Sequence, residues 1–152
     1  MQGGNTEEVE NNPLVGTWRL VRWYNVSDDG METYPLGKEA TGYISYSNDG
    51  FVFVQLMAAN RSLYAVNDPF GGTQEEDSAA MKSQITYAGS YEYRGADVVH
   101  RVTHASCPNW VGTEQVRAVH FKDGRLELTA TGAHLQGRPV TAYVLWERAA
   151  LG

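Results

Sequence analysis

The sequence predicts an all-β fold, in which eight antiparallel strands close into one small barrel with a single short helix at about residues 74–85. Apolar and aromatic residues come in short runs that alternate with polar residues, a period of two that is typical of half-buried strands. Glycine-containing turn sequences separate the runs, and closure would leave no unpaired strand edge. A β-sandwich is the alternative architecture. We expect strands at about 15–26, 40–47, 51–58, 87–94, 98–105, 114–122, 125–131 and 139–148.

Three connections between these strands have the chemistry of tight hairpins. They are Asn48-Asp49-Gly50, Arg94-Gly95-Ala96-Asp97 and Lys122-Asp123-Gly124. Asp-Gly pairs supply the positive φ angles that two-residue hairpin turns require.

The helix at about 74–85 is predicted from its start signal. Thr73 and Glu76 have the spacing of a capping box, in which each side chain bonds the other residue's free backbone amide. Acidic residues follow in the first turn, where the helix dipole favours negative charge. We expect this helix and the loop before it to lie over one mouth of the barrel.

The length of 152 residues fits one domain with a sizeable core. Residues 1–12 are polar and predict a flexible N-terminal lead-in, which leaves 13–152 as the barrel domain.

Charge and composition exclude several partners. The formal net charge is −6 and no Lys or Arg cluster is present, so we expect neither nucleic acid nor an anionic membrane as a partner. No run of about 18 apolar residues predicts a membrane-spanning helix. The polar N-terminus lacks the apolar stretch of a signal peptide, and Cys107 is the single cysteine, so we expect a cytoplasmic protein.

The first and last strands carry a family resemblance. Gly16 and Trp18 form a Gly-x-Trp opening, and Arg148 ends the last expected strand. The chain resembles the bacterial and fungal lipocalin-like domain family, which implies a lipocalin-like barrel and carries no catalytic motif with it. The resemblance also implies that Trp18 packs across the barrel floor with Arg148 over its ring, where a cation is favourable. Some members of that family occur among natural-product biosynthesis proteins. Further matching stretches are 34–37, 41–46, 49–51, 87–91 and 108–117.

Alternation places candidate polar groups on the inward face of two strands. Tyr87 and Tyr91 share one face, and tyrosines give a pocket an apolar wall with a hydroxyl donor; packing in the wall is the alternative. Arg117 alternates with apolar residues and is expected inside, where a guanidinium needs an acidic partner or an anionic ligand. Glu92 and Glu114 are the candidate protein partners.

His100 and His104 are expected on one inward face of the next strand. Histidine is the usual general acid or base near neutral pH, although a hydrogen-bonded structural role is the alternative for each. Four residues apart on a strand is roughly 13 Å, too far to share one metal ion. The sequence also lacks a phosphate loop and a dinucleotide fingerprint, so we expect no metal and no cofactor.

Other side chains are predicted to line the interior. Trp110 is placed in a loop that closes one mouth, and core filling is the alternative for all of this group. The remaining members are Phe53, Gln55, Met57, Arg22 and Tyr24.

Three functions are consistent with the predicted barrel and its interior side chains. The favoured one is a cofactor-independent cyclase or isomerase of a polyketide-like or terpenoid intermediate, with Arg117, His100 and Tyr91 as catalytic residues. The alternative is a non-catalytic binder or carrier of a small hydrophobic ligand. A structural module with a filled barrel is the third. The sequence predicts neither the substrate nor whether the protein is a monomer or a dimer.

Overall fold

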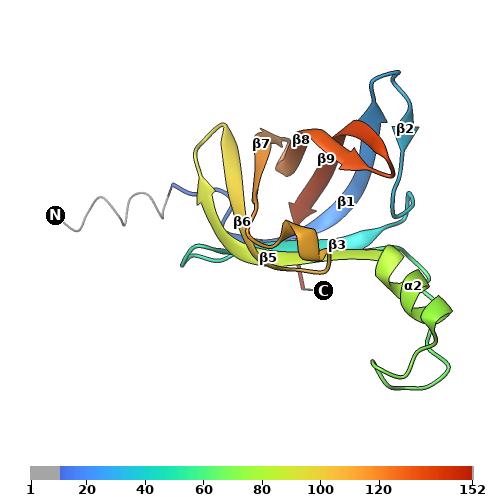
Figure 1. Ribbon diagram of the computed structural model, residues 1–152. Helices are drawn as coiled ribbons and strands as arrows, with labels where there is room; N and C mark the ends of the chain where they lie inside the picture. Colours follow the sequence, from blue (N-terminus) through green and yellow to red (C-terminus); the bar gives the residue numbers. More distant parts are fainter. Residues whose placement is uncertain (1–10, 152) are drawn as a thin grey trace.

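The computed structural model describes residues 11–151 (Figure 1). Residues 1–10 of the predicted lead-in lie outside the described residues, and the division at residue 13 stays a prediction. The α-helix is α2 (Gln74–Lys82), and a short 3₁₀ turn is η1 (Pro108–Trp110). The strands are β1 (Gly16–Ser27), β2 (Glu32–Thr33), β3 (Thr41–Tyr46), β4 (Phe51–Met57), β5 (Gln84–Tyr93), β6 (Asp97–Ala105), β7 (Glu114–Lys122), β8 (Arg125–Leu135) and β9 (Arg138–Arg148).

The long strands form one closed antiparallel sheet. Each pairs with the next in the order β1-β3-β4-β5-β6-β7-β8-β9, and β9 pairs back onto β1 from Trp18–Arg148 to Ser27–Val140. The two-residue strand β2 pairs only with β1 and lies outside the ring. The predicted eight-stranded barrel with one helix is therefore confirmed, and the β1–β9 pairing rules out a sandwich.

The three predicted hairpins and the β8–β9 turn all contain residues with positive φ, among them Gly50 and Gly95 with φ angles of 97° and 89°. Asp123 and Gly124 have φ angles of 54° and 77°, as the Asp-Gly sequence predicted. Strand β8 runs to Leu135, beyond its predicted end near 131, and turns into β9 through Gln136 and Gly137 with φ angles of 55° and 77°.

A clamp between the first and last strands closes the barrel floor. The Arg148 guanidinium carbon lies 3.8 Å from the centroid of the Trp18 ring, as the resemblance implied. Its terminal nitrogens donate to the carbonyls of Val15 and Pro13, each at 2.8 Å. Gly16 has φ +122°, and a Cβ there would lie 2.6 Å from an Arg148 nitrogen, so this position requires glycine.

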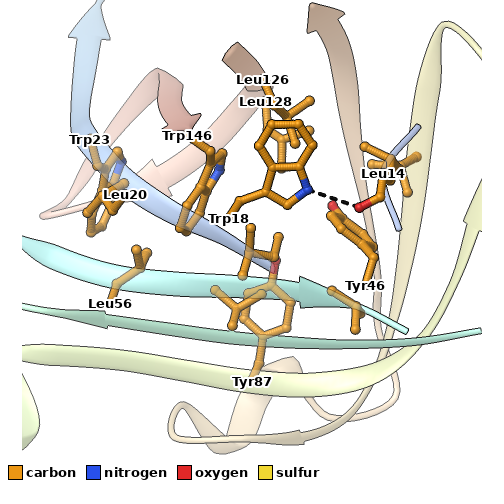
Figure 2. Packing of buried hydrophobic residues seen from close by; sticks show 14 of the residues in the cluster. Leu14, Trp18, Leu20, Trp23, Tyr46, Leu56, Tyr87, Leu126, Leu128 and Trp146 are labelled. Atoms are coloured by element: carbon orange, nitrogen blue, oxygen red, sulfur yellow. Dashed lines mark hydrogen bonds between the residues drawn. The ribbon is translucent and has the colours of Figure 1, made fainter. Parts of the chain in front are cut away.

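The interior is packed with aromatic and branched side chains. Trp18 donates its ring N–H to the Leu14 carbonyl at 2.9 Å, which Figure 2 shows beside Trp146 and Trp23. All three tryptophans are buried, with Ile44 and Leu126 among the residues packed around them.

The barrel has three β-bulges or irregularities in its register, and two of them reverse the faces of strands that carry predicted site residues. The β1–β9 register shifts between Leu20 and Arg22, so Trp18 and Leu20 point inward before the bulge and Trp23 points inward after it. Arg22 is therefore exposed, and Tyr24 lies outside, stacked on Tyr143 at 5.1 Å. The prediction that Arg22 and Tyr24 line the interior is wrong, because the extra residue inverts the alternation.

The second bulge changes the face of β6 on which His104 lies. The β5–β6 register shifts between Ala88 and Gly89, where Ala88 pairs with His104 and Gly89 pairs with Val102. His100 and Val102 are buried, whereas His104 is exposed and its imidazole lies 3.0 Å from the Thr103 hydroxyl. The prediction that His104 shares the inward face of His100 is wrong for the same reason.

Strand β4 faces the opposite way from the prediction. Val52, Val54 and Leu56 are buried, whereas Phe53 is 53% exposed on the outer surface. Gln55 and Met57 share the face of Phe53 and also lie outside. The prediction for these three residues is wrong because both faces of the strand are apolar in sequence, so alternation does not distinguish them.

Helix α2 begins as predicted and stands apart from the barrel. Thr73 and Glu76 form both bonds of the capping box. The helix ends at Lys82, short of the predicted 85, because β5 begins at Gln84 and pairs with β4. Figure 1 shows α2 and its loop projecting away from the strands, and no residue of 58–83 lines the interior cavity, so the predicted lid is wrong. The single α-helix among residues 11–151 is too short and too polar to traverse a bilayer.

Candidate ligand-binding site

The barrel contains an open cavity of about 630 Å³. This volume lies within the range of small-molecule sites in proteins, roughly 300–1,000 Å³. Its inner wall is apolar and is formed by residues of the packed core: Trp23 and Trp146 together with Ile44, Val54 and Leu56. An open cavity therefore lies beside that core, whereas the structural module considered from the sequence predicted none.

The cavity opens where strand β7 changes partners. The first half of β7, from Glu114 to Ala118, pairs with β6, and the second half, from Ala118 to Lys122, pairs with β8. The end of β8, residues 130–135, pairs only with β9. Both unpaired edges line the cavity, so the opening lies between the start of β7 and the end of β8.

Arg117 lies at this opening and lines the cavity. Its side chain is half-buried and donates to the Gln115 side-chain oxygen and to the Val116 carbonyl. The inward position predicted from alternation is confirmed. No carboxylate within residues 11–151 forms an ion pair with it.

The carboxylates predicted to pair with Arg117, and one further carboxylate that lines the cavity, are paired with other arginines. Glu92 and Glu114, the predicted partners of Arg117, lie 3.0 Å and 3.5 Å from Arg101 nitrogens instead. Asp97, which lines the cavity, lies 2.7 Å from an Arg94 nitrogen. Arg117 therefore carries the positive charge that remains available to a ligand at this opening.

His100 lies behind the cavity wall in a buried chain of three side chains. Its Nε2 lies 2.8 Å from the Tyr46 hydroxyl, and its Nδ1 lies 2.7 Å from the Tyr87 hydroxyl. Burial, reinforced by the positive charge of Arg117, lowers the pKa of His100 to about 3, so the imidazole is neutral at physiological pH. The structural alternative considered for this histidine, a fully hydrogen-bonded ring, matches this geometry.

Tyr87 connects this chain to the cavity. It is 9% exposed, lines the cavity and packs edge-on against Trp110, with ring centroids 5.8 Å apart. Burial raises the pKa of Tyr87, so its hydroxyl keeps its proton. Trp110, in η1, also lines the cavity at its predicted place beside a mouth of the barrel.

Tyr91 shares the inward face of β5 but lies away from the cavity. Its hydroxyl donates to the Ser47 carbonyl at 2.9 Å and accepts from the Asn12 amide at 3.1 Å. Its ring packs edge-on against Tyr46. Because it does not line the cavity, the structure gives no support to a catalytic role for Tyr91.

The structure therefore brings together three of the predicted residues, Arg117, Tyr87 and Trp110, with His100 behind them. Sequence reasoning missed the two wall tryptophans and Tyr46. The Ile44–Tyr46 alternation in β3 was a usable signal for Tyr46, whereas Trp23 follows a bulge that the sequence does not mark. Within the described residues, no group of three or more His, Cys, Asp or Glu side chains is placed to hold a metal ion.

Comparison with known proteins gives three findings. The model of a family described as "Lipocalin-like domain" matches residues 15–149. A 4'-hydroxy-3'-methoxypropiophenone carrier protein of Aspergillus oryzae is 30% identical over 103 residues, which are 62% of this chain and 93% of that protein. A crystal structure of a lipocalin-like protein from Bacteroides uniformis matches with a TM-score of 0.48 and 12% identity, over 91% of this chain and all of the other.

Proposed function

Because the chain belongs to the lipocalin-like domain family, we propose that it binds and carries a small hydrophobic ligand that bears an oxygen acceptor. The observation that carries this proposal is the cavity itself: an apolar wall with Arg117 as a charged donor that no carboxylate of the described chain neutralises. An apolar wall supplies affinity by removing ligand surface from water, and a few placed polar groups fix orientation. The cytoplasm is the compartment we propose, because the sequence has a single cysteine, which cannot form a disulfide within the chain.

The relative from Aspergillus oryzae supports an aryl ketone as the ligand class. Its name describes a carrier of a propiophenone, a molecule with an aromatic ring, a ketone, one phenol hydroxyl and one methoxy group. A ketone or phenolate oxygen is an acceptor that a guanidinium binds well. The tryptophans of the wall offer ring faces for such a ligand.

A cofactor-independent cyclase or isomerase is the second candidate, supported by one observation. Arg117 and Tyr87 both line the cavity and are donors that could polarise a carbonyl. A cyclase also needs a group that moves protons near neutral pH. His100 fits that role poorly because it is buried behind Tyr87 with its pKa lowered to about 3. This difference makes the carrier the function that we propose.

The first test is a non-denaturing mass spectrum of the freshly purified protein, followed by titration with 4'-hydroxy-3'-methoxypropiophenone. Binding should quench the fluorescence of the tryptophans in the wall. We expect the ligand to be recovered unchanged after prolonged incubation. Conversion of this ketone into a product would favour the enzyme, and the absence of both binding and retained ligand would contradict a binding function for this ligand class.

Arg117→Met tests the site directly, because methionine keeps much of the apolar stem and removes the charge. Loss of a charge-assisted hydrogen bond of about 1.5–3 kcal/mol should weaken binding of the ketone roughly tenfold to a hundredfold. Arg22→Met is the matched control, since Arg22 is exposed on the outer surface. Equal affinity in the two variants would show that Arg117 does not hold the ligand.

A further inference from the structure

We propose that the Tyr46–His100–Tyr87 chain holds the imidazole proton on Nδ1 and thereby directs the Tyr87 hydroxyl proton into the cavity, where Tyr87 and Arg117 form a two-donor site for one ketone or phenolate oxygen. This inference rests on the proposed binding function and names the chemistry of its polar subsite. Tyr46 and His100 are positioning residues: they orient the Tyr87 hydroxyl, and neither of them lines the cavity.

The His100 ring has two hydrogen-bond partners and, when neutral, a single N–H proton. Both partners are tyrosine hydroxyls, one at each ring nitrogen. One tyrosine must therefore donate to the ring and the other must accept from it. The accepting tyrosine keeps its own hydroxyl proton free for another partner.

Burial decides which tyrosine accepts. Tyr46 is 1% exposed, and within residues 11–151 its hydroxyl has one hydrogen-bond partner, His100 Nε2. If Tyr46 accepted from the ring, its own proton would be left without a partner inside the core, which is costly. Tyr46 therefore donates to Nε2, and the ring proton lies on Nδ1.

This tautomer determines the direction of the Tyr87 hydroxyl proton, and Tyr87 lines the cavity. Its oxygen accepts from Nδ1–H, so its own proton is free to point toward the space that its side chain lines. The lowered pKa of His100 and the raised pKa of Tyr87 keep both groups in these neutral forms. The Tyr87 hydroxyl therefore remains a donor across the physiological range of pH.

Arg117 supplies the second donor. It lines the same cavity, and its charge is close enough to act on the pKa of Tyr87 and of His100. Each of these side chains presents hydrogens here, so the complementary ligand atom is an acceptor. A ketone or phenolate oxygen meets this requirement, whereas an alkyl chain or an ammonium group does not.

The orientation is tested without any ligand. In protein labelled with ¹⁵N-histidine, a long-range ¹H–¹⁵N spectrum distinguishes the protonated ring nitrogen from the unprotonated one. We expect His100 in the wild-type chain to be protonated on Nδ1 only. In Tyr46→Phe, which lacks the donor to Nε2, this preference should be lost. A wild-type ring protonated on Nε2, or an unchanged spectrum in Tyr46→Phe, would overturn the inference.

The donor role is tested with a matched pair of probes, propiophenone and propylbenzene, which differ by the ketone oxygen. Tyr87→Phe should weaken binding of propiophenone about fivefold to tenfold and leave propylbenzene unchanged. Tyr91→Phe is the control, because Tyr91 lies on the same strand and face but outside the cavity. Equal losses for the two probes would refute the donor role of Tyr87.

The two proposals fail in different ways. If the wild-type chain binds neither probe, the binding function is contradicted for this class, and the tautomer of His100 still decides the hydroxyl orientation. If Tyr87→Phe does not fold, the wild-type spectrum and the Tyr46→Phe spectrum remain decisive, because neither uses that variant.

Discussion

The clamp at the barrel floor gives a stability prediction whose size follows from its contacts. Arg148→Met removes a cation from a position 3.8 Å from the Trp18 ring and two hydrogen bonds to the carbonyls of Val15 and Pro13. The side chain is partly exposed, so we use the low end of each range: about 0.5–1 kcal/mol for the ring contact and about 0.5 kcal/mol or more for each bond. We expect a loss of about 2 kcal/mol.

The assay is urea unfolding monitored by tryptophan fluorescence, with the slope m checked for constancy. For a chain of this length, about 2 kcal/mol corresponds to a decrease in Tm of roughly 4–8 °C. The control is Arg19→Met, because Arg19 makes an exposed ion pair with Glu147 at 3.6 Å that should contribute under about 1 kcal/mol.

The contact between Gly16 and Arg148 can be tested by combining a substitution at each position. A Cβ at Gly16 would displace the Arg148 guanidinium. Gly16→Ala should therefore lower the free energy of unfolding in two ways, through backbone strain at a positive φ and through loss of the clamp. In the Arg148→Met background only the backbone cost should remain. If the two substitutions are additive, the guanidinium and Gly16 do not interact as the structure shows.

Two further predictions concern His100 and the helix. His100 binds its proton more weakly in the folded state, with a pKa of about 3 against about 6.5 unfolded, so its contribution to stability is full above pH 6.5 and falls as the pH drops toward 3. We expect the free energy of unfolding, measured with urea, to fall by about 2 kcal/mol between pH 7.5 and 5. This pH dependence should persist in His104→Gln and be reduced in His100→Asn. Thr73→Ala removes the cap of α2 and should cost about 1 kcal/mol locally, seen as faster amide hydrogen exchange in 74–82. Ligand affinity should not change in Thr73→Ala, because no residue of α2 lines the cavity; a weaker affinity would restore the helix as a lid.

The architecture was predictable because hairpin chemistry and the hydrophobic period agree along most of the chain. Asp123-Gly124 placed a turn, and Arg117 was placed inside by its alternation with Val119, which is buried. These are local signals, and each is set by residues within a few positions of one another.

The faces of several strands were not predictable, for two physical reasons. A bulge adds one residue without changing the local composition, so nothing near Val21 or Thr103 marks the inversion that places Trp23 inside and His104 outside. Strand β4 is apolar on both faces, and only the assembled barrel selects Val54 for the interior over Phe53. Orientation there is a property of the whole sheet.

The pairing of β1 with β9 has a consequence for how the chain reaches its native state. The contacts that complete the ring, Trp18–Arg148 and Leu20–Trp146, join the first long strand to the last. During synthesis the edge of β1 that pairs with β9 therefore stays unpaired until every other described strand has been made, and closure requires a loop of nearly the whole domain. Folding should be slow for a protein of this size, with the edges of β1 and β9 the surfaces most exposed to aggregation before the ring closes.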